Sequence, residues 1–321
     1  MAERQKIILT RRYPPPVEQR ASRDYDAVLN PDDKILSADQ IVSLADGASA
    51  LMICSSEKMT RDVIMRLPQS VKAVSTFSAG LDHIDLDAAR ERGLRIGNTP
   101  DAVTIATAEI AMLLILTAAR RATEGQAMLR NREWTGWHTM QLLGRRLDGK
   151  RLGIFGMGKI GQALAKRARG FDMIIHYHNR NRLPPELELG AIYHDSFESL
   201  TSVSDVLSLN APATPETKFI LNSTAIARLP EAAIVVNTAR GDLVVDDDLI
   251  AALKSGRLMA AGLDVFMGEP GIHEGYYDLS NAFLLPHLGS ATMEARNEMG
   301  FAALDNIDAI LSGREPPYGV V

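Results

Sequence analysis

The stretch RLGIFGMGKIGQALAKRARGFDMIIHYHNRNR, residues Arg151–Arg182, decides the fold of this chain. It opens with an apolar run typical of a buried strand, and Gly156, Gly158 and Gly161 then form the pattern G-x-G-x-x-G ahead of a helical segment. In such a unit the first glycine permits a tight turn, the second lets the backbone approach a pyrophosphate, and the third allows close packing of helix and strand. The pattern predicts a dinucleotide site; a tight structural turn is the alternative.

The segment after the second strand of this unit is basic. Units that bind NAD usually place Asp or Glu about 20 residues after the first glycine, where it accepts a hydrogen bond from a ribose hydroxyl. No acidic residue lies between Tyr177 and Leu183, whereas Arg180 and Arg182 do. Because a guanidinium matches phosphate oxygens in a bidentate way, we expect these arginines to bind a 2′-phosphate. NADP(H) is therefore the predicted cofactor, with NAD(H) as the second choice and a solvated basic loop as the alternative.

Apolar runs of strand length alternate with helical patterns along the chain. The runs after Gly149 match the six strands of a doubly wound dinucleotide domain, and they are Leu152–Phe155, Met173–His178, Val206–Leu209, Ile234–Thr238, Ala260–Val265 and Phe283–Leu285. Those of the first third are Lys6–Thr10, Ala50–Cys54, Val71–Thr76 and Leu94–Gly97. This alternation predicts an α/β fold with parallel sheets that carry helices on both faces.

Composition narrows the class of protein. The 321 residues are 46% hydrophobic and 23% charged, which suits one large or two medium domains. The net charge of −5 provides no general basic field, so we expect neither nucleic acid nor a membrane as a partner. The single cysteine, Cys54, excludes an internal disulfide and a cysteine-based metal site, and we expect no metal. Together with the lack of a signal-peptide pattern, these features predict a cytoplasmic protein.

Two helical segments stand outside the alternation. Ala108–Arg130 is predicted to be one long helix whose apolar first half must be buried on several sides. Burial in the core of one chain and burial between two subunits both explain this composition, and we prefer the homodimer. The second segment, Ala291–Ser312, is predicted to be a helix that ends at Gly313 and can pack back on the first domain.

Three polar residues follow successive strands of the second domain: Arg240, Glu269 and His287. Ligands of open parallel sheets lie at the carboxyl ends of the strands, which is where a nicotinamide is expected. For a 2-keto acid, Arg240 can hold the carboxylate and polarise the ketone. His287 can give a proton to the carbonyl oxygen as a hydride arrives, because an imidazole titrates near neutral pH. Glu269 can pair with that imidazole and orient it. Taken singly, a surface Arg, a turn Glu and a strand-end His are the alternatives.

With these motifs the chain resembles the D-isomer-specific 2-hydroxyacid dehydrogenase family, and within it the NADPH-dependent glyoxylate/hydroxypyruvate reductases. The resemblance runs nearly from end to end. Its main segments are STFSAGLDHIDLDAA (Ser75–Ala89), GNTPDAVTIATAEIAMLLIL (Gly97–Leu116), GIFGMGKIG (Gly153–Gly161), NAPATPET (Asn210–Thr217), VNTARGDLVVDDDL (Val236–Leu249), AGLDVFMGEP (Ala261–Pro270) and LPHLGS (Leu285–Ser290).

The resemblance implies a Rossmann cofactor domain inserted in a flavodoxin-like substrate domain, both doubly wound, with a cleft between them. The substrate-binding domain would comprise residues 1–103 and 291–321, and the dinucleotide-binding domain residues 104–290. Backbone N–H groups of Ser78, Ala79 and Gly80 would receive the substrate carboxylate beside Arg240. Cofactor contacts are implied, besides those of the glycines, the two arginines and His287, for Thr107, Met157, Lys159, Ile160, Asn179, Pro212, Thr238, Ala239, Asp264 and Gly289.

The resemblance also implies a homodimer paired through the helix from Ala108, in which Glu133–Gly144 reaches the partner's active site. Trp134, Trp137, His138 and Met140 would then influence substrate size, whereas packing is the other explanation for two tryptophans.

The predicted function is NADPH-dependent reduction of a short 2-keto acid, glyoxylate or hydroxypyruvate, to the D-2-hydroxy acid, with His287 as proton donor. One alternative is a dehydrogenase of the same family that acts on a larger 2-keto acid. The other is an NAD(P)-sensing interaction protein that is similar to the family's corepressors.

Overall fold

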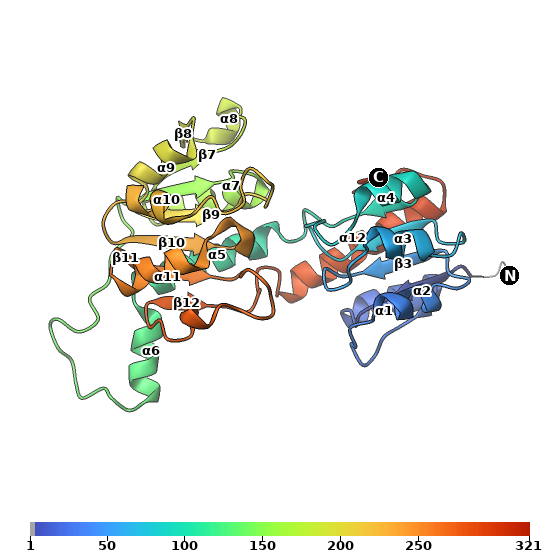
Figure 1. Cartoon of the computed structure of the whole chain (residues 1–321), viewed down its shortest axis with the longest axis horizontal. Coiled ribbons are helices and arrows are strands. Elements are labelled where there is room, and N and C mark those ends of the chain that lie inside the picture. Colours follow the sequence, from blue (N-terminus) through green and yellow to red (C-terminus); the bar gives the residue numbers. More distant parts are fainter. Residues whose placement is uncertain (1–3) are drawn as a thin grey trace. The chain divides into compact units, whose positions relative to one another are not determined.

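The structure is a computed structural model that describes residues 4–321. The chain divides into two units, one of Met1–Val103 with Ser290–Val321 and the other of Thr104–Gly289. Each unit is built on a parallel sheet with helices on both faces (Figure 1), which confirms the predicted α/β class. The predicted boundary placed Ser290 with the second unit, whereas the structure assigns it to the first.

The first unit contains a five-stranded sheet in the order β2-β1-β3-β4-β5, the order of a flavodoxin-like fold. Its strands are β1 (Lys6–Leu9), β2 (Asp26–Val28), β3 (Ala50–Ile53), β4 (Ala73–Thr76) and β5 (Arg95–Gly97). Its helices are α1 (Pro15–Asp24), α2 (Ala38–Leu44), α3 (Arg61–Arg66), α4 (Leu86–Arg92) and α12 (Met293–Leu311). The strand β2 was not predicted, because Asp26–Val28 begins with an acidic residue and forms no apolar run.

Alternating side chains divide the first unit into layers. Ile8 and Leu51 belong to a core beneath α2, α3 and α4, whereas α1 and α12 pack together, and α12 lies against β4. A Cβ on Gly300 would lie 2.3 Å from Val17 Cγ2, so this glycine allows α12 to approach α1 closely. The helix predicted for Ala291–Ser312 is therefore α12, and it belongs to this unit.

The second unit contains a seven-stranded sheet in the order β12-β11-β10-β9-β6-β7-β8, which is the doubly wound dinucleotide-binding order extended by one strand. Its strands are β6 (Arg151–Phe155), β7 (Ile174–His178), β8 (Ile192–His194), β9 (Val206–Leu209), β10 (Ala233–Asn237), β11 (Leu258–Leu263) and β12 (Ala282–Leu284). The short edge strand β8 was not predicted. The α-helices are α5 (Thr104–Ala119), α6 (Ala122–Arg130), α7 (Lys159–Arg169), α8 (Pro185–Glu188), α9 (Phe197–Val203), α10 (Ser223–Arg228) and α11 (Asp246–Lys254), and the 3₁₀ helices are η1 (Gly241–Leu243) and η2 (Glu274–Tyr276).

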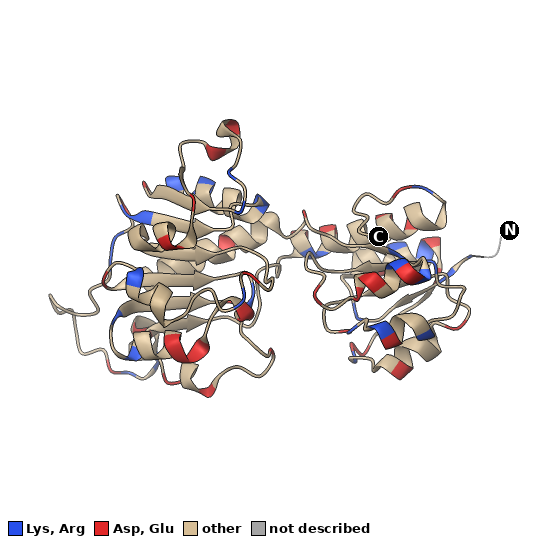
Figure 2. Cartoon of the chain, turned by 45° about the horizontal axis from the view of Figure 1, so that its top comes forward, with Lys and Arg blue, Asp and Glu red and all other residues tan. Residues whose placement is uncertain are grey.

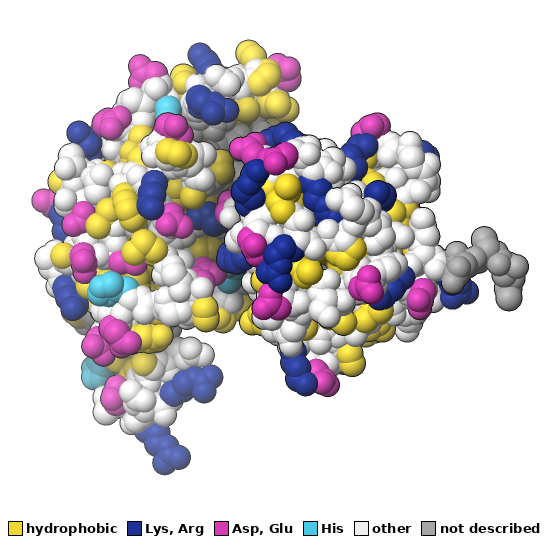
Figure 3. All heavy atoms as spheres, turned by 45° about the vertical axis from the view of Figure 1, so that its right-hand side comes forward, with side chains coloured by type: hydrophobic (Ala, Val, Ile, Leu, Met, Phe, Trp, Pro, Cys, Tyr) yellow, Lys and Arg dark blue, Asp and Glu magenta, His cyan; other side chains and the backbone are white. Residues whose placement is uncertain are grey.

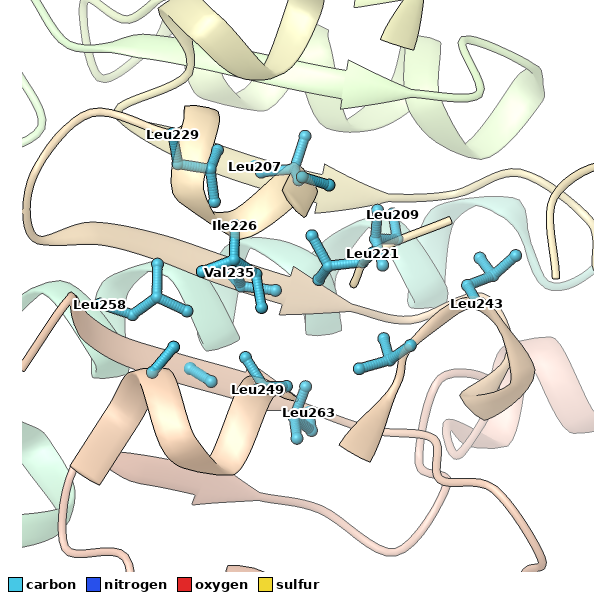
Figure 4. Packing of buried hydrophobic residues seen from close by; sticks show 14 of the residues in the cluster. Leu207, Leu209, Leu221, Ile226, Leu229, Val235, Leu243, Leu249, Leu258 and Leu263 are labelled. Atoms are coloured by element: carbon cyan, nitrogen blue, oxygen red, sulfur yellow. The ribbon is translucent and has the colours of Figure 1, made fainter. Parts of the chain in front are cut away.

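Two hydrophobic cores lie on opposite faces of this second sheet. On one face Leu207 and Val235 meet Ile226 and Leu249 beneath α10 and α11 (Figure 4). On the other face α5 and α7 cover the alternate side chains of the same strands, such as Ile154 of β6. Both faces of the central strands are therefore buried, which explains why these strands are continuous apolar runs in the sequence.

The prediction of one helix over Ala108–Arg130 is wrong. The structure has two helices, α5 and α6, which are separated at Arg121, a residue with φ of +53°. A left-handed residue cannot continue an α-helix, and Arg121 is held there by hydrogen bonds of 2.8 and 2.6 Å from its guanidinium to Glu124. The apolar character of α5 is largely explained within the chain, because α5 packs on α7, β10 and β11.

Charges are interspersed over the molecule. Acidic and basic residues alternate over helices and loops of each unit (Figure 2), and the face drawn in Figure 3 mixes hydrophobic, acidic and basic side chains. Within residues 4–321, no helix combines the length and the apolar character that crossing a bilayer requires.

Candidate active site

The glycine turn between β6 and α7 has three distinct environments. Gly156 has φ of +96°, and a Cβ there would lie 2.5 Å from the backbone nitrogen of Ala211, so only glycine fits this tight turn. A Cβ on Gly161 would lie 2.5 Å from the carbonyl oxygen of Gly156, so helix and turn are in close contact. A Cβ on Gly158 would meet no atom within 4 Å. The open space is at the middle glycine, where a pyrophosphate would approach.

These residues fit the phosphates of a dinucleotide. The helix α7 begins at Lys159 directly after the turn, so its N-terminal N–H groups and the positive end of its dipole face that space. Asn179 fixes the turn from the end of β7, because its Oδ1 accepts a hydrogen bond of 2.6 Å from the N–H of Met157. Asn179 thus supports the turn through the protein itself, a contact that the sequence did not reveal.

The basic loop, residues 179–184, contains both arginines, which have different contacts. Arg180 is exposed. Arg182 forms a bidentate ion pair with Glu188, with distances of 2.7 Å from Nε to Oε1 and 3.1 Å from Nη2 to Oε2. Arg182 is thus paired with a carboxylate six residues further along the chain, and the binding of a 2′-phosphate by these arginines stays a prediction.

The carboxyl edge, which comprises the loops that follow β10, β11 and β12, brings Glu269 and His287 together. Nδ1 of His287 lies 2.7 Å from Oε2 of Glu269. The other carboxylate oxygen accepts a hydrogen bond of 2.8 Å from the N–H of Phe266. Burial acts to raise the pKa of Glu269, but the bonds from His287 and Phe266 and the charges of His287 and Arg240 outweigh it, so the pKa is lowered. The carboxylate is thus kept ionised beside the imidazole.

Asp264 anchors the loop that carries His287. Its buried carboxylate accepts hydrogen bonds of 2.6 Å from the N–H of Leu288 and 2.8 Å from the N–H of Gly289. Its carbonyl oxygen accepts from the N–H of His287 at 2.9 Å. These bonds hold His287 at φ of +54°, a left-handed conformation that costs a non-glycine residue about 1 kcal/mol. The side chain of His287 remains 51% exposed, so the imidazole is held by its backbone and by Glu269 while it faces solvent.

Asn237 anchors the loop that carries Arg240. The buried amide of Asn237 donates to the carbonyl of Arg240 at 2.8 Å and accepts from the N–H of Ala239 at 3.0 Å. The next residue, Gly241, has no room for a side chain, since a Cβ would lie 1.9 Å from the carbonyl carbon of Phe266. The loop of Arg240 therefore packs directly on the loop that leads to Glu269. Asn237 was not singled out from the sequence, although an Asn that precedes a turn is the signal that could have indicated it.

The remaining predicted residues occupy definite places in their own units. Thr107, on α5, donates from Oγ1 to the carbonyl of Gly289 at 3.1 Å. Thr238 and Ala239 are buried after β10, Pro212 is exposed after β9, and Ile160 lies in the first turn of α7. In the first unit, Ser78–Gly80 form a loop after β4 in which Ser78 Oγ donates to the carbonyl of Gly80 at 2.6 Å. The N–H groups of this loop donate no hydrogen bond within residues 4–321.

The described His, Cys, Asp and Glu side chains do not gather into a metal-binding group. Among the described residues, no group of three or more His, Cys, Asp or Glu side chains has an arrangement that could hold a metal ion.

A family model and curated relatives match this chain. The model described as "D-isomer specific 2-hydroxyacid dehydrogenase, NAD binding domain" matches residues 112–289. A glycerate dehydrogenase from Hyphomicrobium methylovorum is 51% identical over 319 residues, which cover 99% of this chain and 99% of that protein. A glyoxylate reductase from Thermococcus litoralis is 39% identical over 317 residues, which cover 97% of this chain and 95% of that protein.

A solved structure matches both units. It is the NADPH-dependent glyoxylate/hydroxypyruvate reductase from Sinorhizobium meliloti, in complex with NADP and malonate. It is 29% identical with a TM-score of 0.88, and the match covers 99% of this chain and 97% of that one. The two-unit α/β architecture described above is thus that of a known oxidoreductase.

Proposed function

Because the chain belongs to the D-isomer-specific 2-hydroxyacid dehydrogenase family and carries its NAD-binding domain, we propose that it reduces glyoxylate and hydroxypyruvate to the D-2-hydroxy acids with NADPH. The observation that carries the proposal is the 2.7 Å contact between Glu269 and His287, on the edge of the sheet that also bears Arg240. Relatives named glycerate dehydrogenase and glyoxylate reductase support a short 2-keto acid as the substrate class.

Proton delivery is the role proposed for His287. A nicotinamide cofactor would supply the hydride for the carbonyl carbon. Since Nδ1 of His287 is engaged by Glu269, Nε2 is the ring nitrogen left to protonate the carbonyl oxygen. The ionised Glu269 stabilises the imidazolium before the transfer and fixes the plane of the ring. Imidazolium at this position also helps to stabilise negative charge that develops on the oxygen.

Carboxylate binding is the role proposed for Arg240 and the loop Ser78–Gly80. Arg240 offers a guanidinium at the carboxyl edge, and its loop is fixed by Asn237. The N–H groups of Ser78, Ala79 and Gly80 donate no hydrogen bond within the described residues, so they are able to bind a carboxylate. Two independent anion-binding groups would select a 2-keto acid over a simple ketone.

NADPH is the proposed reductant. The end of β7 lacks the acidic residue that would accept from the ribose 2′-hydroxyl and repel a 2′-phosphate. Arg180, exposed at this point, supplies a guanidinium for the phosphate. The reductase from Sinorhizobium meliloti is named NADPH-dependent, which supports the same preference here.

A homodimer is the proposed assembly. The helix α6 and the segment that follows it extend away from the sheet of the second unit (Figure 1). Trp134, Trp137 and Met140 of this segment are 54%, 80% and 76% exposed, so packing within the chain does not account for them. Apolar side chains exposed to this degree favour contact with a second copy. Sedimentation should give about twice the 35.0 kDa of one chain, and W137S/M140S should reduce that mass; a monomeric wild type would contradict the proposal.

Initial-rate kinetics test the proposed activity. Oxidation of NADPH and NADH would be measured with glyoxylate, hydroxypyruvate, pyruvate and phenylpyruvate. We expect the highest kcat/KM with NADPH as the cofactor and with glyoxylate or hydroxypyruvate as the substrate. Preference for phenylpyruvate would show that the pocket serves a larger keto acid, and cofactor binding without any turnover would point to a sensing protein.

A further inference from the structure

The ion pair between Arg182 and Glu188 engages one of the two guanidinium groups of the basic loop. Besides the two bonds from Arg182, the carboxylate accepts a hydrogen bond of 2.5 Å from the hydroxyl of Tyr177. Glu188 is buried, and the Arg182 guanidinium also lies over the ring of Tyr193 at 5.5 Å from its centroid. Arg182 is thus held by a bidentate pair and by an aromatic face, although its side chain is 62% exposed.

Arg180 differs from Arg182 in its contacts. Both side chains are exposed, but within residues 4–321 Arg180 forms no salt bridge. It follows Asn179 directly, and Asn179 contacts the glycine turn. Arg180 therefore lies next to the residues that are expected to bind the dinucleotide, and no described carboxylate forms an ion pair with it.

We propose that Glu188 is a specificity-determining residue, which withholds Arg182 from a 2′-phosphate and thereby limits the preference for NADPH over NADH. Arg180 is then the guanidinium that binds the phosphate. This inference rests on the proposed function, because it concerns the dinucleotide of the same site. A chain that lacked the carboxylate would offer two guanidinium groups instead of one, and would discriminate more strongly between the two cofactors.

The hydrogen bonds of the carboxylate show how firmly it holds Arg182. The bonds from Arg182, followed by that from Tyr177, lower the pKa of Glu188 to about 2. Glu188 is therefore ionised throughout the physiological range, and Arg182 is not released by ordinary changes of pH. A substitution at Glu188 is therefore the direct way to release Arg182.

Three variants distinguish the effect of the ion pair with Arg182 from the effect of the net charge near the loop. Glu188→Gln keeps the shape of the side chain and a partner for Tyr177 but loses the ion pair. Glu188→Asp keeps the charge but is one methylene too short for the same bidentate contact. Glu186→Gln is the matched control, because Glu186 is exposed on the same helix, α8, and forms no salt bridge with a described residue.

The test measures binding by the full chain, so it does not depend on turnover. Calorimetry would compare ADP-ribose with its 2′-phosphate, two ligands that differ only in the phosphate. Glu188→Gln should raise the affinity for the phosphorylated ligand, relative to ADP-ribose, about tenfold, since a charge-assisted contact is gained. Glu188→Asp should raise this ratio in the same direction, and Glu186→Gln should leave it unchanged.

The double variant R182Q/E188Q identifies the cause. Its affinity ratio should return to within about twofold of the wild type, since neither chain offers Arg182 to the phosphate. A gain that persists in the double variant would show that only the negative charge of Glu188 matters, and the proposal would be overturned. An unchanged ratio in Glu188→Gln would overturn it as well. If Glu188→Gln fails to fold, the Glu188→Asp result decides in the same way. An enzyme inactive toward keto acids would still show this pattern, so the two proposals fail independently.

Discussion

The arginines of the carboxyl edge and of the basic loop are held in different ways. At the carboxyl edge the buried groups Asn237 and Asp264 hold the backbone of Arg240 and His287, and the side chain of His287 remains half exposed. In the basic loop, side chains hold one another, and Arg182 is held by Glu188. The residues proposed for catalysis are thus supported from the core, whereas the pair proposed to limit cofactor preference lies at the surface, where one substitution can change it.

The largest effect is expected where the carboxyl edge delivers its proton. His287→Ala should lower kcat about 10³-fold, because a positioned general acid contributes between about 10²- and 10⁴-fold. Dissociation constants for NADPH, measured by fluorescence, should change little, since the glycine turn is untouched. Retained turnover would remove His287 from the mechanism and with it the role assigned to the carboxyl edge.

Two alanine substitutions in the glycine turn should differ in their effects on stability and on NADPH binding. Gly156→Ala should destabilise the fold by at least about 2 kcal/mol, because its φ of +96° and the 2.5 Å approach to Ala211 exclude a Cβ. Gly158→Ala should cost less than about 1 kcal/mol and yet weaken NADPH binding, because its Cβ enters open space meant for phosphate. Urea unfolding and fluorescence titration would separate the two. Equal losses of stability would contradict the assignment of that space.

A smaller effect is expected from a substitution that tests whether the hydrogen bonds of Asn237 position Arg240. Asn237→Asp still accepts from Ala239 but cannot donate to the carbonyl of Arg240. We expect KM for the keto acid to rise about tenfold, since Arg240 is displaced, while NADPH affinity is retained. A loss of stability without any change in KM would make Asn237 a purely structural residue.

The smallest effect concerns pH and the basic loop. The pKa of Glu188 falls from an ordinary 4.5 to about 2 on folding, so its pair stabilises the folded state above pH 4.5 and is lost as pH falls toward 2. The wild type should therefore melt above Glu188→Gln at pH 7, with the same difference at pH 5 and a smaller one at pH 3. A difference that grew on acidification would contradict the ionised pair.

The sequence predicted most of the frame of this protein, because its signals are local. Buried strands such as Val206–Leu209 are continuous apolar runs, and Gly93 and Gly313 end helices in the left-handed conformation that glycine favours. The edge strands β2 and β8 were not predicted because Asp26–Val28 and Ile192–His194 each contain a charged or polar residue and form no apolar run. The break at Arg121 escaped because the helix propensity of the surrounding residues gives no sign of a left-handed residue.

The site was predictable in its residue types and less so in its contacts. Arg240, Glu269 and His287 follow three strands of one parallel sheet, so topology alone placed them at one edge. The roles of Asn237 and Glu188 depend on which atoms meet after folding, and no spacing rule contains that information. The pairing of Arg182 with Glu188 is such a contact, which a count of charges in the loop could not reveal.

The stereochemistry and stoichiometry of one reaction test the central claim most directly. The protein would be incubated with hydroxypyruvate and NADPH, and the glycerate formed would be resolved by chiral chromatography. Membership of the D-isomer-specific family, with Arg240, Glu269 and His287 as the proposed reacting residues, predicts D-glycerate, with one molecule formed for each NADPH oxidised. Formation of L-glycerate, or oxidation of NADPH without glycerate, would contradict it.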